Sequence, residues 1–231
     1  MSDLPPLVEL EAVGKTYRSG DIAVPVLRDV GLTIRAGEYV AIMGRSGSGK
    51  STLMNILGLL DRPTTGSYRF EGREVAALGD DERSRLRGQV IGFVFQRFHL
   101  LPNLDVLRNV ELPMRYSKVS ADERRRRATD LLERVGLGHR LGHRPAQLSG
   151  GECQRVAIAR SLANHPRVVL ADEPTGNLDT SAHAKVMQLF ADLRRDLGLT
   201  LILVTHDQSV GRAAERCIEV SDGRIGARAH D

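Results

Sequence analysis

Cysteine is scarce in this chain of 231 residues, which contains only Cys153 and Cys217. The first lies in a segment whose pattern predicts a helix and the second in a predicted strand, and their spacing is not one that metal sites use. We therefore expect two buried, reduced thiols, and neither a disulfide nor a metal site.

Long apolar runs are missing as well. No stretch approaches the roughly 18 apolar residues that a membrane-spanning helix needs, and the first residues lack a basic region followed by an apolar segment. These absences predict a cytoplasmic chain. If it serves a membrane process, we expect it to reach the cytoplasmic face of the cell membrane only by docking onto another protein.

A strong charge imbalance is also lacking, since Lys and Arg number 33 and Asp and Glu 29, for a formal net charge of +4. Such an excess would attract nucleic acid or anionic lipid only if it gathered on one face, so we expect no nucleic-acid partner. Lysine is rare among the basic residues, which makes each lysine more informative: Lys15, Lys50, Lys118 and Lys185. The hydrophobic content of 41% suffices for a sizeable core and argues against intrinsic disorder.

Short apolar runs, in contrast, are frequent and rich in β-branched residues. They alternate with helical patterns, which is typical of an α/β fold with a buried, mostly parallel sheet. The predicted strands are Leu7–Val13, Tyr39–Met43, Val90–Phe95, Val168–Ala171, Leu199–Thr205 and Cys217–Val220. Between Gln96 and Pro166 the strand pattern stops, and helical segments such as Leu104–Leu112 and Ala121–Val135 take over. We therefore predict a helical lobe inserted into the sheet domain.

A glycine-rich loop follows the predicted strand Tyr39–Met43 and precedes a helical segment. It reads Gly44-Arg45-Ser46-Gly47-Ser48-Gly49-Lys50-Ser51-Thr52, which satisfies the phosphate-loop pattern G-x-x-x-x-G-K-[ST]. Glycines let successive backbone N–H groups point at phosphate oxygens, and the following helix offers its positive end. We expect Lys50 to reach the β- and γ-phosphates of ATP and Ser51 to coordinate Mg²⁺.

Two adjacent carboxylates end another predicted strand, Val168–Ala171. Asp172 comes at its C-terminal end, where doubly wound sheets gather their ligand groups, and Glu173 follows directly. A nucleotide hydrolase needs one group for the metal shell and another that orients water for in-line attack. We predict that Asp172 holds Mg²⁺ and that Glu173 polarises the attacking water.

Phosphate loops occur in kinases, GTPases, helicases and transport motors, so a further motif is needed to choose among them. The segment Leu148-Ser149-Gly150-Gly151-Glu152 opens the helical stretch Cys153–Ala163, and its hydroxyl and backbone amides make a second phosphate-binding helix start. It resembles the LSGGE/Q signature of the ABC ATPases. The other motifs of that family follow in the same order along almost the whole chain.

The resemblance implies roles for further residues. Tyr17 resembles the aromatic platform for adenine, Gln96 the glutamine that senses metal and water, and His206 the switch histidine at the γ-phosphate. Asn177-Leu178-Asp179 resembles the D-loop, and Thr52 is implied to bind the α-phosphate. Ser149 and Gly151 are implied to contact the γ-phosphate held by a second protomer, so two ATP molecules would be sandwiched in a homodimer. The implied catalytic residues are Glu173, His206 and Gln96; the implied Mg²⁺ ligands are Ser51, Gln96 and Asp172; and the implied ATP contacts are Tyr17, the loop from Gly44 to Thr52, Gln96, Ser149, Gly150, Gly151, Glu152, Asp179 and His206.

Within that family the chain resembles the MacB/LolD group, through three segments: Ser51–Gly58, Gly92–Pro102 and Ala171–Asp179. That group includes macrolide and peptide exporters and lipoprotein-release systems, many of which pull on substrate outside the inner membrane without carrying it through. Since the sequence ends at Asp231 with no membrane part, the resemblance implies a separate permease.

The fold implied by the resemblance is a P-loop NTPase of the ABC type. It has a mostly parallel sheet core, a small antiparallel β region and an inserted helical subdomain. The implied catalytic lobe comprises residues 1–95 and 165–231, and the helical lobe with the signature comprises residues 96–164. Phe98, Leu100 and Leu101 form an apolar cluster that we expect to carry the permease contact.

Two other functions remain as alternatives. An ABC ATPase of DNA repair or chromosome handling is suggested only by the pI of about 9.4, and the 97 positions between Ser51 and Leu148 leave no room for the long insertions of that class. The sequence does little to exclude a regulatory ATPase that acts on a membrane complex without transport, like the cell-division relative of the same group. The contact region Gln96–Pro113 favours the exporter.

Overall fold

Two units of the chain each bury an apolar core of their own in the computed structural model, which describes residues 5–228. The first unit runs to Arg87 and resumes at Thr200, and the second is Gly88–Leu199. The division into these two units reflects which residues pack together. The lobe boundaries expected from the sequence, 96–164 within 1–95 and 165–231, concern motif content and stay a prediction.

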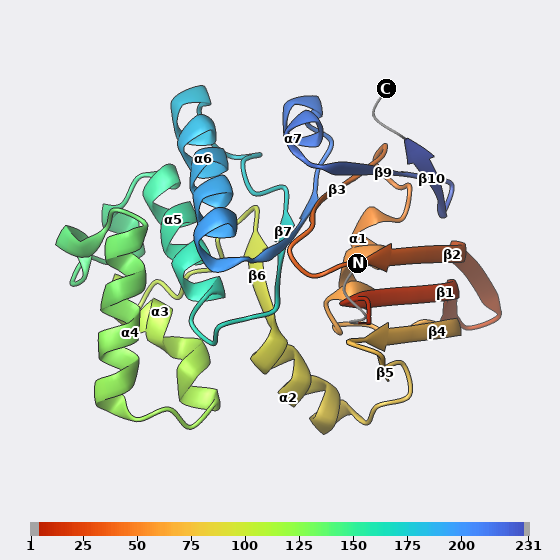
Figure 1. Cartoon of the computed structure of the whole chain (residues 1–231), viewed down its shortest axis with the longest axis horizontal. Helices are drawn as coiled ribbons and strands as arrows, with labels where there is room; N and C mark the ends of the chain where they lie inside the picture. The colour runs from red at the N-terminus through yellow and green to blue at the C-terminus, as the bar shows by residue number, and fades with distance from the viewer. Residues whose placement is uncertain (1–4, 229–231) are drawn as a thin grey trace. The chain divides into compact units, whose positions relative to one another are not determined.

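The first unit contains an antiparallel sheet in the order β2-β1-β4-β5 (Figure 1). The turn between its two long strands passes through Gly20, whose φ is 58°. The strands are β1 (Val8–Ser19), β2 (Ile22–Ile34), β4 (Thr65–Phe70) and β5 (Arg73–Glu74). The predicted antiparallel region is therefore present, and the strand expected at Leu7–Val13 extends to Ser19.

A second sheet of this unit is built around β3 (Tyr39–Met43), which pairs in parallel with both β8 (Thr200–Val204) and β9 (Arg216–Ser221). β10 (Arg224–Arg228) runs antiparallel along β9. Every residue of β8 is buried, which explains its continuous apolar sequence. The helices that begin in this unit are α1 (Lys50–Leu57), α2 (Asp80–Val90) and α7 (Gln208–Ala213).

The second unit pairs β6 (Ile91–Phe95) in parallel with β7 (Val168–Asp172). Between these two strands the described chain forms no strand, as the sequence predicts, and helices fill the interval (Figure 1). A side chain at Gly92 would overlap the backbone of Ser161, so glycine lets α5 pack directly on β6. The helices are α3 (Val106–Tyr116), α4 (Ala121–Arg134), α5 (Gly150–Ser161) and α6 (Thr180–Leu197), with 3-10 turns at Gly138–Arg140 and Pro145–Gln147.

Four of these helices begin with a side-chain cap. The caps are Asp105, Ser120, Ser149 and Asp179, and each accepts a hydrogen bond from the backbone N–H three residues later. Such caps satisfy donors that a helix start leaves free, so the helix boundaries follow from the local sequence.

Both Cys153 and Cys217 are buried, which confirms the burial expected for them. Burial, with a smaller contribution from the Glu152 carboxylate, raises the pKa of the Cys153 thiol. Across residues 5–228, none of the helices has the length and apolar character that crossing a membrane requires.

Candidate functional site

The loop between β3 and α1 has a backbone that depends on glycine. Gly44, Gly47 and Gly49 have φ values of 154°, 77° and 105°, in the region where other residues are strained. At Gly44 a Cβ would also overlap the carbonyl oxygen of Val220, so no larger residue fits there. Gly49 is the N-cap of α1, so the loop leads into a helix N-terminus, as the sequence pattern predicts.

Two polar groups of this loop are placed to meet an anion. Lys50 Nζ donates to the carbonyl oxygens of Gly44 at 2.7 Å and Arg45 at 2.9 Å, which holds the ammonium against the loop. Ser48 Oγ is buried and has no hydrogen-bond partner among the described residues. A buried unpaired hydroxyl is costly, and a phosphate oxygen would satisfy it. Lys50, Ser48 and the glycine backbone therefore fit a phosphate group.

Tyr17, the predicted adenine platform, lies on β1 with 41% of its surface exposed. Its hydroxyl donates to Asp61 Oδ2 at 2.8 Å. The pKa of Tyr17 is raised by burial and by the hydrogen bond to Asp61, while the hydroxyl of Thr52 acts in the opposite direction. Thr52 belongs to the first turn of α1, so the ring lies beside the helix that follows the phosphate loop.

Lys15 and Asp61 are residues that sequence reasoning missed at this site. Lys15 Nζ lies 4.8 Å from the centroid of the Tyr17 ring and donates to Asp61 Oδ1 at 2.5 Å. Burial alone would raise the pKa of Asp61, but the hydrogen bonds from Lys15 and Tyr17 outweigh it and lower the pKa. The only available signal in the sequence was the rarity of lysine.

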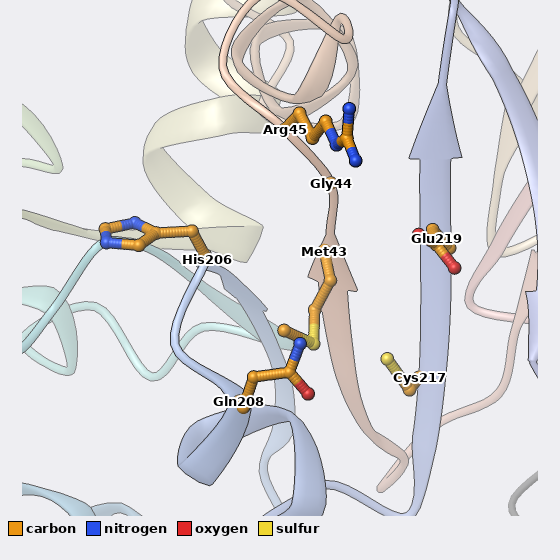
Figure 2. A pocket seen from close by; sticks show the side chains of 7 residues that line it. All are labelled: Met43, Gly44, Arg45, His206, Gln208, Cys217 and Glu219. Atoms are coloured by element: carbon orange, nitrogen blue, oxygen red, sulfur yellow. The ribbon is translucent and has the colours of Figure 1, made fainter.

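His206 follows β8 and shares a pocket of about 250 Å³ with the start of the phosphate loop, Gly44 and Arg45. The side of the pocket on β9 is lined by Cys217 and Glu219 (Figure 2). Since β9 pairs in parallel with β3, these side chains lie beside the strand that leads into the loop. The structure thus brings the predicted switch histidine to the phosphate loop within the first unit.

The second unit brings the predicted carboxylates close to Gln96. Phe95 at the end of β6 pairs with Asp172 at the end of β7, so Gln96 and Glu173 are the next residues along two neighbouring strands. Carboxyl ends of parallel strands meet at one edge of a sheet, where ligands of α/β folds bind. Both Asp172 and Glu173 are only partly buried.

Gln96 also contacts the segment after Glu173. Its Nε2 donates to Asn177 Oδ1 at 3.4 Å, and Asn177 Nδ2 donates to the Gln96 carbonyl at 3.0 Å. A Cβ at Gly176 would lie 2.8 Å from Gln96 Nε2, so glycine permits this approach. The glutamine and the predicted D-loop are therefore held together, a pairing that the sequence did not indicate.

The signature segment begins α5 as predicted. Ser149 caps the helix, and its N–H and hydroxyl donate to Glu152 Oε2 at 2.8 and 2.9 Å. The Ser149 N–H, together with its hydroxyl and Arg140, holds the pKa of the Glu152 carboxyl below its ordinary value against the opposing effect of burial. Ser149 and Gly150 are exposed. The start of α5 is therefore exposed at Ser149 and Gly150, while Gly151 is buried and the Glu152 N–H donates to Ser149 Oγ.

Gly150 packs against the segment that ends at Asp179, and Gly151 packs against α6. A Cβ at Gly150 would lie 3.6 Å from Leu178, and one at Gly151 would lie 3.0 Å from the Ala182 Cβ. Asp179 caps α6 by accepting from the Ala182 N–H at 2.8 Å. The structure therefore gives Asp179 a local role in starting α6, and its predicted ATP contact stays a prediction.

Comparison with known proteins indicates the same family as the motifs of the site. A family model described as "ABC transporter" matches residues 27–176. A macrolide export ATP-binding/permease protein, MacB 1/2 of Paracoccus denitrificans (strain Pd 1222), is 56% identical over 222 residues, or 96% of this chain and 33% of that protein. The chain thus spans about a third of the length of its MacB relatives. The ABC transporter ATP-binding protein YvrO of Bacillus subtilis (strain 168) is 51% identical over 95% of both chains.

Among solved structures, the dimeric ATP-binding cassette MJ0796 bound to ADP and Pi superposes with a TM-score of 0.87 at 45% identity, covering 96% of this chain and 100% of that one. The structural similarity at 45% identity confirms the predicted fold. It is an α/β fold of the ABC ATPase type, with an antiparallel sheet and a mostly parallel sheet.

Proposed function

Because this chain belongs to the ABC transporter family and is an ATP-hydrolysing ATPase of that type, we propose that ATP-driven closure of its homodimer powers a separate membrane permease of the MacB/LolD kind. Such a motor works on substrate outside the membrane through its permease. The observation that carries this proposal is a pair of helix N-termini suited to phosphate, one after the glycine-rich loop at Gly49 and one at Ser149. Two such starts in one chain suit two nucleotides shared between two copies.

For ATP, the loop from Gly44 to Thr52 would bind the phosphates and Tyr17 would stack on the adenine. Lys50 would meet the β- and γ-phosphates with its ammonium. The exposed Ser149 and the helix start at Gly150 and Gly151 would bind the γ-phosphate held by a second copy.

For hydrolysis, Glu173 would accept a proton from the attacking water and His206 would contact the γ-phosphate. Mg²⁺ is a hard cation that prefers oxygen ligands, and the hydroxyl of Ser51, the amide oxygen of Gln96 and the carboxylate of Asp172 fit it. When bound, the ion would neutralise charge that develops on the phosphates. Ser48 Oγ, which is buried and has no hydrogen-bond partner within residues 5–228, supports the fit to a nucleotide phosphate.

The permease is proposed as a separate chain because YvrO matches over 95% of its length and is an ATP-binding protein by name. The MacB relatives, whose names include a permease, are matched over only about a third of their length. The expected partner is a four-helix membrane protein with a large extracytoplasmic domain. It should copurify with this chain when the two are expressed together, and a pair that never copurifies would argue for another partner.

The dimer is tested with Glu173→Gln, which leaves the proposed ATP and metal contacts intact and removes the group that polarises water. We expect this variant to bind Mg-ATP, to lose nearly all turnover and to sediment as a dimer only with ATP. Lys50→Ala is the matched control and should stay monomeric with ATP. Near-wild-type turnover of Glu173→Gln would show that Glu173 is not catalytic. If this variant sediments as a dimer without ATP as well, ATP is not the cause of closure.

A further inference from the structure

Glu173 has a backbone conformation that its own sequence does not favour. Its φ is 44°, in the left-handed region that residues other than glycine seldom adopt. The next residue is Pro174, and a residue before proline prefers extended backbone. A conformation of this kind persists only when the surrounding structure holds it in place. The direction in which the Glu173 carboxylate leaves the chain therefore depends on contacts around this peptide.

One such contact comes from Gln154, a residue of α5 that is completely buried. Its Nε2 donates to the Pro174 carbonyl oxygen at 2.6 Å. A carbonyl only accepts hydrogen bonds, so the amide orientation is fixed by chemistry. Since proline has no N–H, this carbonyl is the one backbone group through which Pro174 can be held by a hydrogen bond.

The other end of the Gln154 amide has no partner. Its Oε1 is buried and accepts no hydrogen bond from any described residue. A buried acceptor left without a donor destabilises a protein, so this end of the amide has a cost that the hydrogen bond to Pro174 must offset. The amide is thus poorly arranged for stability and well arranged to hold Pro174.

The position of Gln154 links two parts of the second unit. It lies five residues after Ser149, the cap of the signature helix, and 20 residues before Pro174 in the sequence. A short hydrogen bond therefore joins the signature helix to the peptide that follows the predicted catalytic carboxylate. A second bond, from the Gly176 N–H to the Glu173 carbonyl at 3.1 Å, closes the turn.

We propose that Gln154 is a positioning residue for ATP hydrolysis, which holds the Pro174 carbonyl and thereby the left-handed backbone that aims the Glu173 carboxylate at the attacking water. This inference deepens the proposed function and rests on the role given there to Glu173. It predicts that Gln154 affects turnover without touching nucleotide or metal.

The test replaces Gln154 with methionine, which matches its length and has no donor. We expect kcat to fall about 10- to 100-fold, because a small displacement of a reacting group has an effect of that size. Affinity for Mg-ATP, measured by titration calorimetry, should stay within about twofold, because Lys50 and the phosphate loop are unchanged. The melting temperature should change little, because the variant removes the unpaired Oε1 but also takes the donor away from the Pro174 carbonyl.

Controls separate positioning from folding. Ser161→Ala removes another buried side-chain hydrogen bond of α5, from Ser161 Oγ to the Ile158 carbonyl at 2.7 Å, and should leave kcat unchanged. Gln154→Leu takes over the test if the methionine variant does not fold. A wild-type kcat in a folded variant would overturn the proposal. So would a parallel loss of affinity, turnover and melting temperature.

A double-mutant cycle separates this proposal from the proposed function. In the Glu173→Gln background, Gln154→Met should have no further effect on the residual turnover, because the group that it positions is already lost. Additive losses would overturn the positioning role and leave Glu173 catalytic. If Glu173→Gln alone keeps its turnover, the assigned catalytic role fails and the positioning proposal falls with it.

Discussion

Lys15 places its ammonium 4.8 Å from the ring centroid of Tyr17, and the two side chains share the carboxylate of Asp61. The lysine is largely buried, with 12% of its side chain exposed, whereas Tyr17 as a whole residue is 41% exposed. An aromatic ring that lies beside a cation on a partly exposed residue is suited to stack on a flat ligand. The predicted adenine platform is therefore a group of three residues.

The first prediction concerns the ring itself. Tyr17→Ala should weaken ATP binding about tenfold, because stacking of a base on an aromatic ring contributes about 1–3 kcal/mol. Tyr17→Phe is the matched control, since it keeps the ring and loses only the hydrogen bond to Asp61. Titration with Mg-ATP measures both. Equal losses in the two variants would show that the hydroxyl matters and the ring does not.

The second prediction concerns how the stability of the protein changes at acidic pH. The lowered pKa of Asp61 means that its charged form is favoured in the folded state, relative to an ordinary value of 3.8. Its contribution to stability is thus present above the unfolded pKa and is lost as pH falls through the folded value. The melting temperature of Asp61→Asn should lie below that of the wild type near neutral pH. This difference in melting temperature should become smaller below about pH 4. A difference that does not change with pH would contradict the stabilising role of the Asp61 charge.

The third prediction concerns the shared site. Lys50→Ala and Gly151→Asp should each remove ATP occlusion in their homodimers, the first by losing phosphate affinity and the second by placing a carboxylate against the γ-phosphate. Verified heterodimers of the two variants should regain one intact site, built from the unmodified loop of one chain and the unmodified signature of the other. Occluded ATP is scored beside hydrolysis, because the two sites can be coupled.

Gly151→Ala is the control for this experiment. It adds the same Cβ, 3.0 Å from the Ala182 Cβ, without the charge. Its homodimer should retain more ATP than Gly151→Asp. If heterodimers occlude no more ATP than either parent, the two helix starts do not share a nucleotide.

The fourth prediction concerns the apolar cluster at Phe98, Leu100 and Leu101. The backbone at Phe98 and His99 is left-handed, and Arg160 donates to both carbonyls, at 2.7 and 2.5 Å. This clamp involves no side chain of the loop itself, so Phe98→Asp should leave the loop conformation in place.

We expect Phe98→Asp to keep basal ATPase activity and to lose stimulation by the permease. Tyr116→Asp, on a residue 84% exposed at the end of α3, is the matched control and should keep the stimulation. Unfolding of the purified Phe98→Asp variant would favour core packing of Phe98 over a contact with the permease.

Much of the site could be predicted from short segments of the sequence. The loop after Met43 and the helix start at Ser149 took the predicted shapes, because glycine φ angles and side-chain caps act over only a few residues. The strand expected at Tyr39–Met43 has those same bounds in the structure. The segment Ile22–Ile34 was missed as a strand, because Pro25 and exposed residues at its start interrupt the apolar pattern, and pairing with β1 decides its form.

The sequence by itself therefore determined the family, the order of the motifs and the residues with chemical groups suited to ATP. Only the tertiary structure decided that Lys15 meets Asp61 across 46 positions, that Gln96 pairs with Asn177 across 81, and that Gln154 holds Pro174. Hydrogen bonds between distant residues depend on how strands and helices pack, and a pattern of nearby residues carries no record of that packing. Local rules thus set the loops and caps, and packing set the partners of the functional side chains.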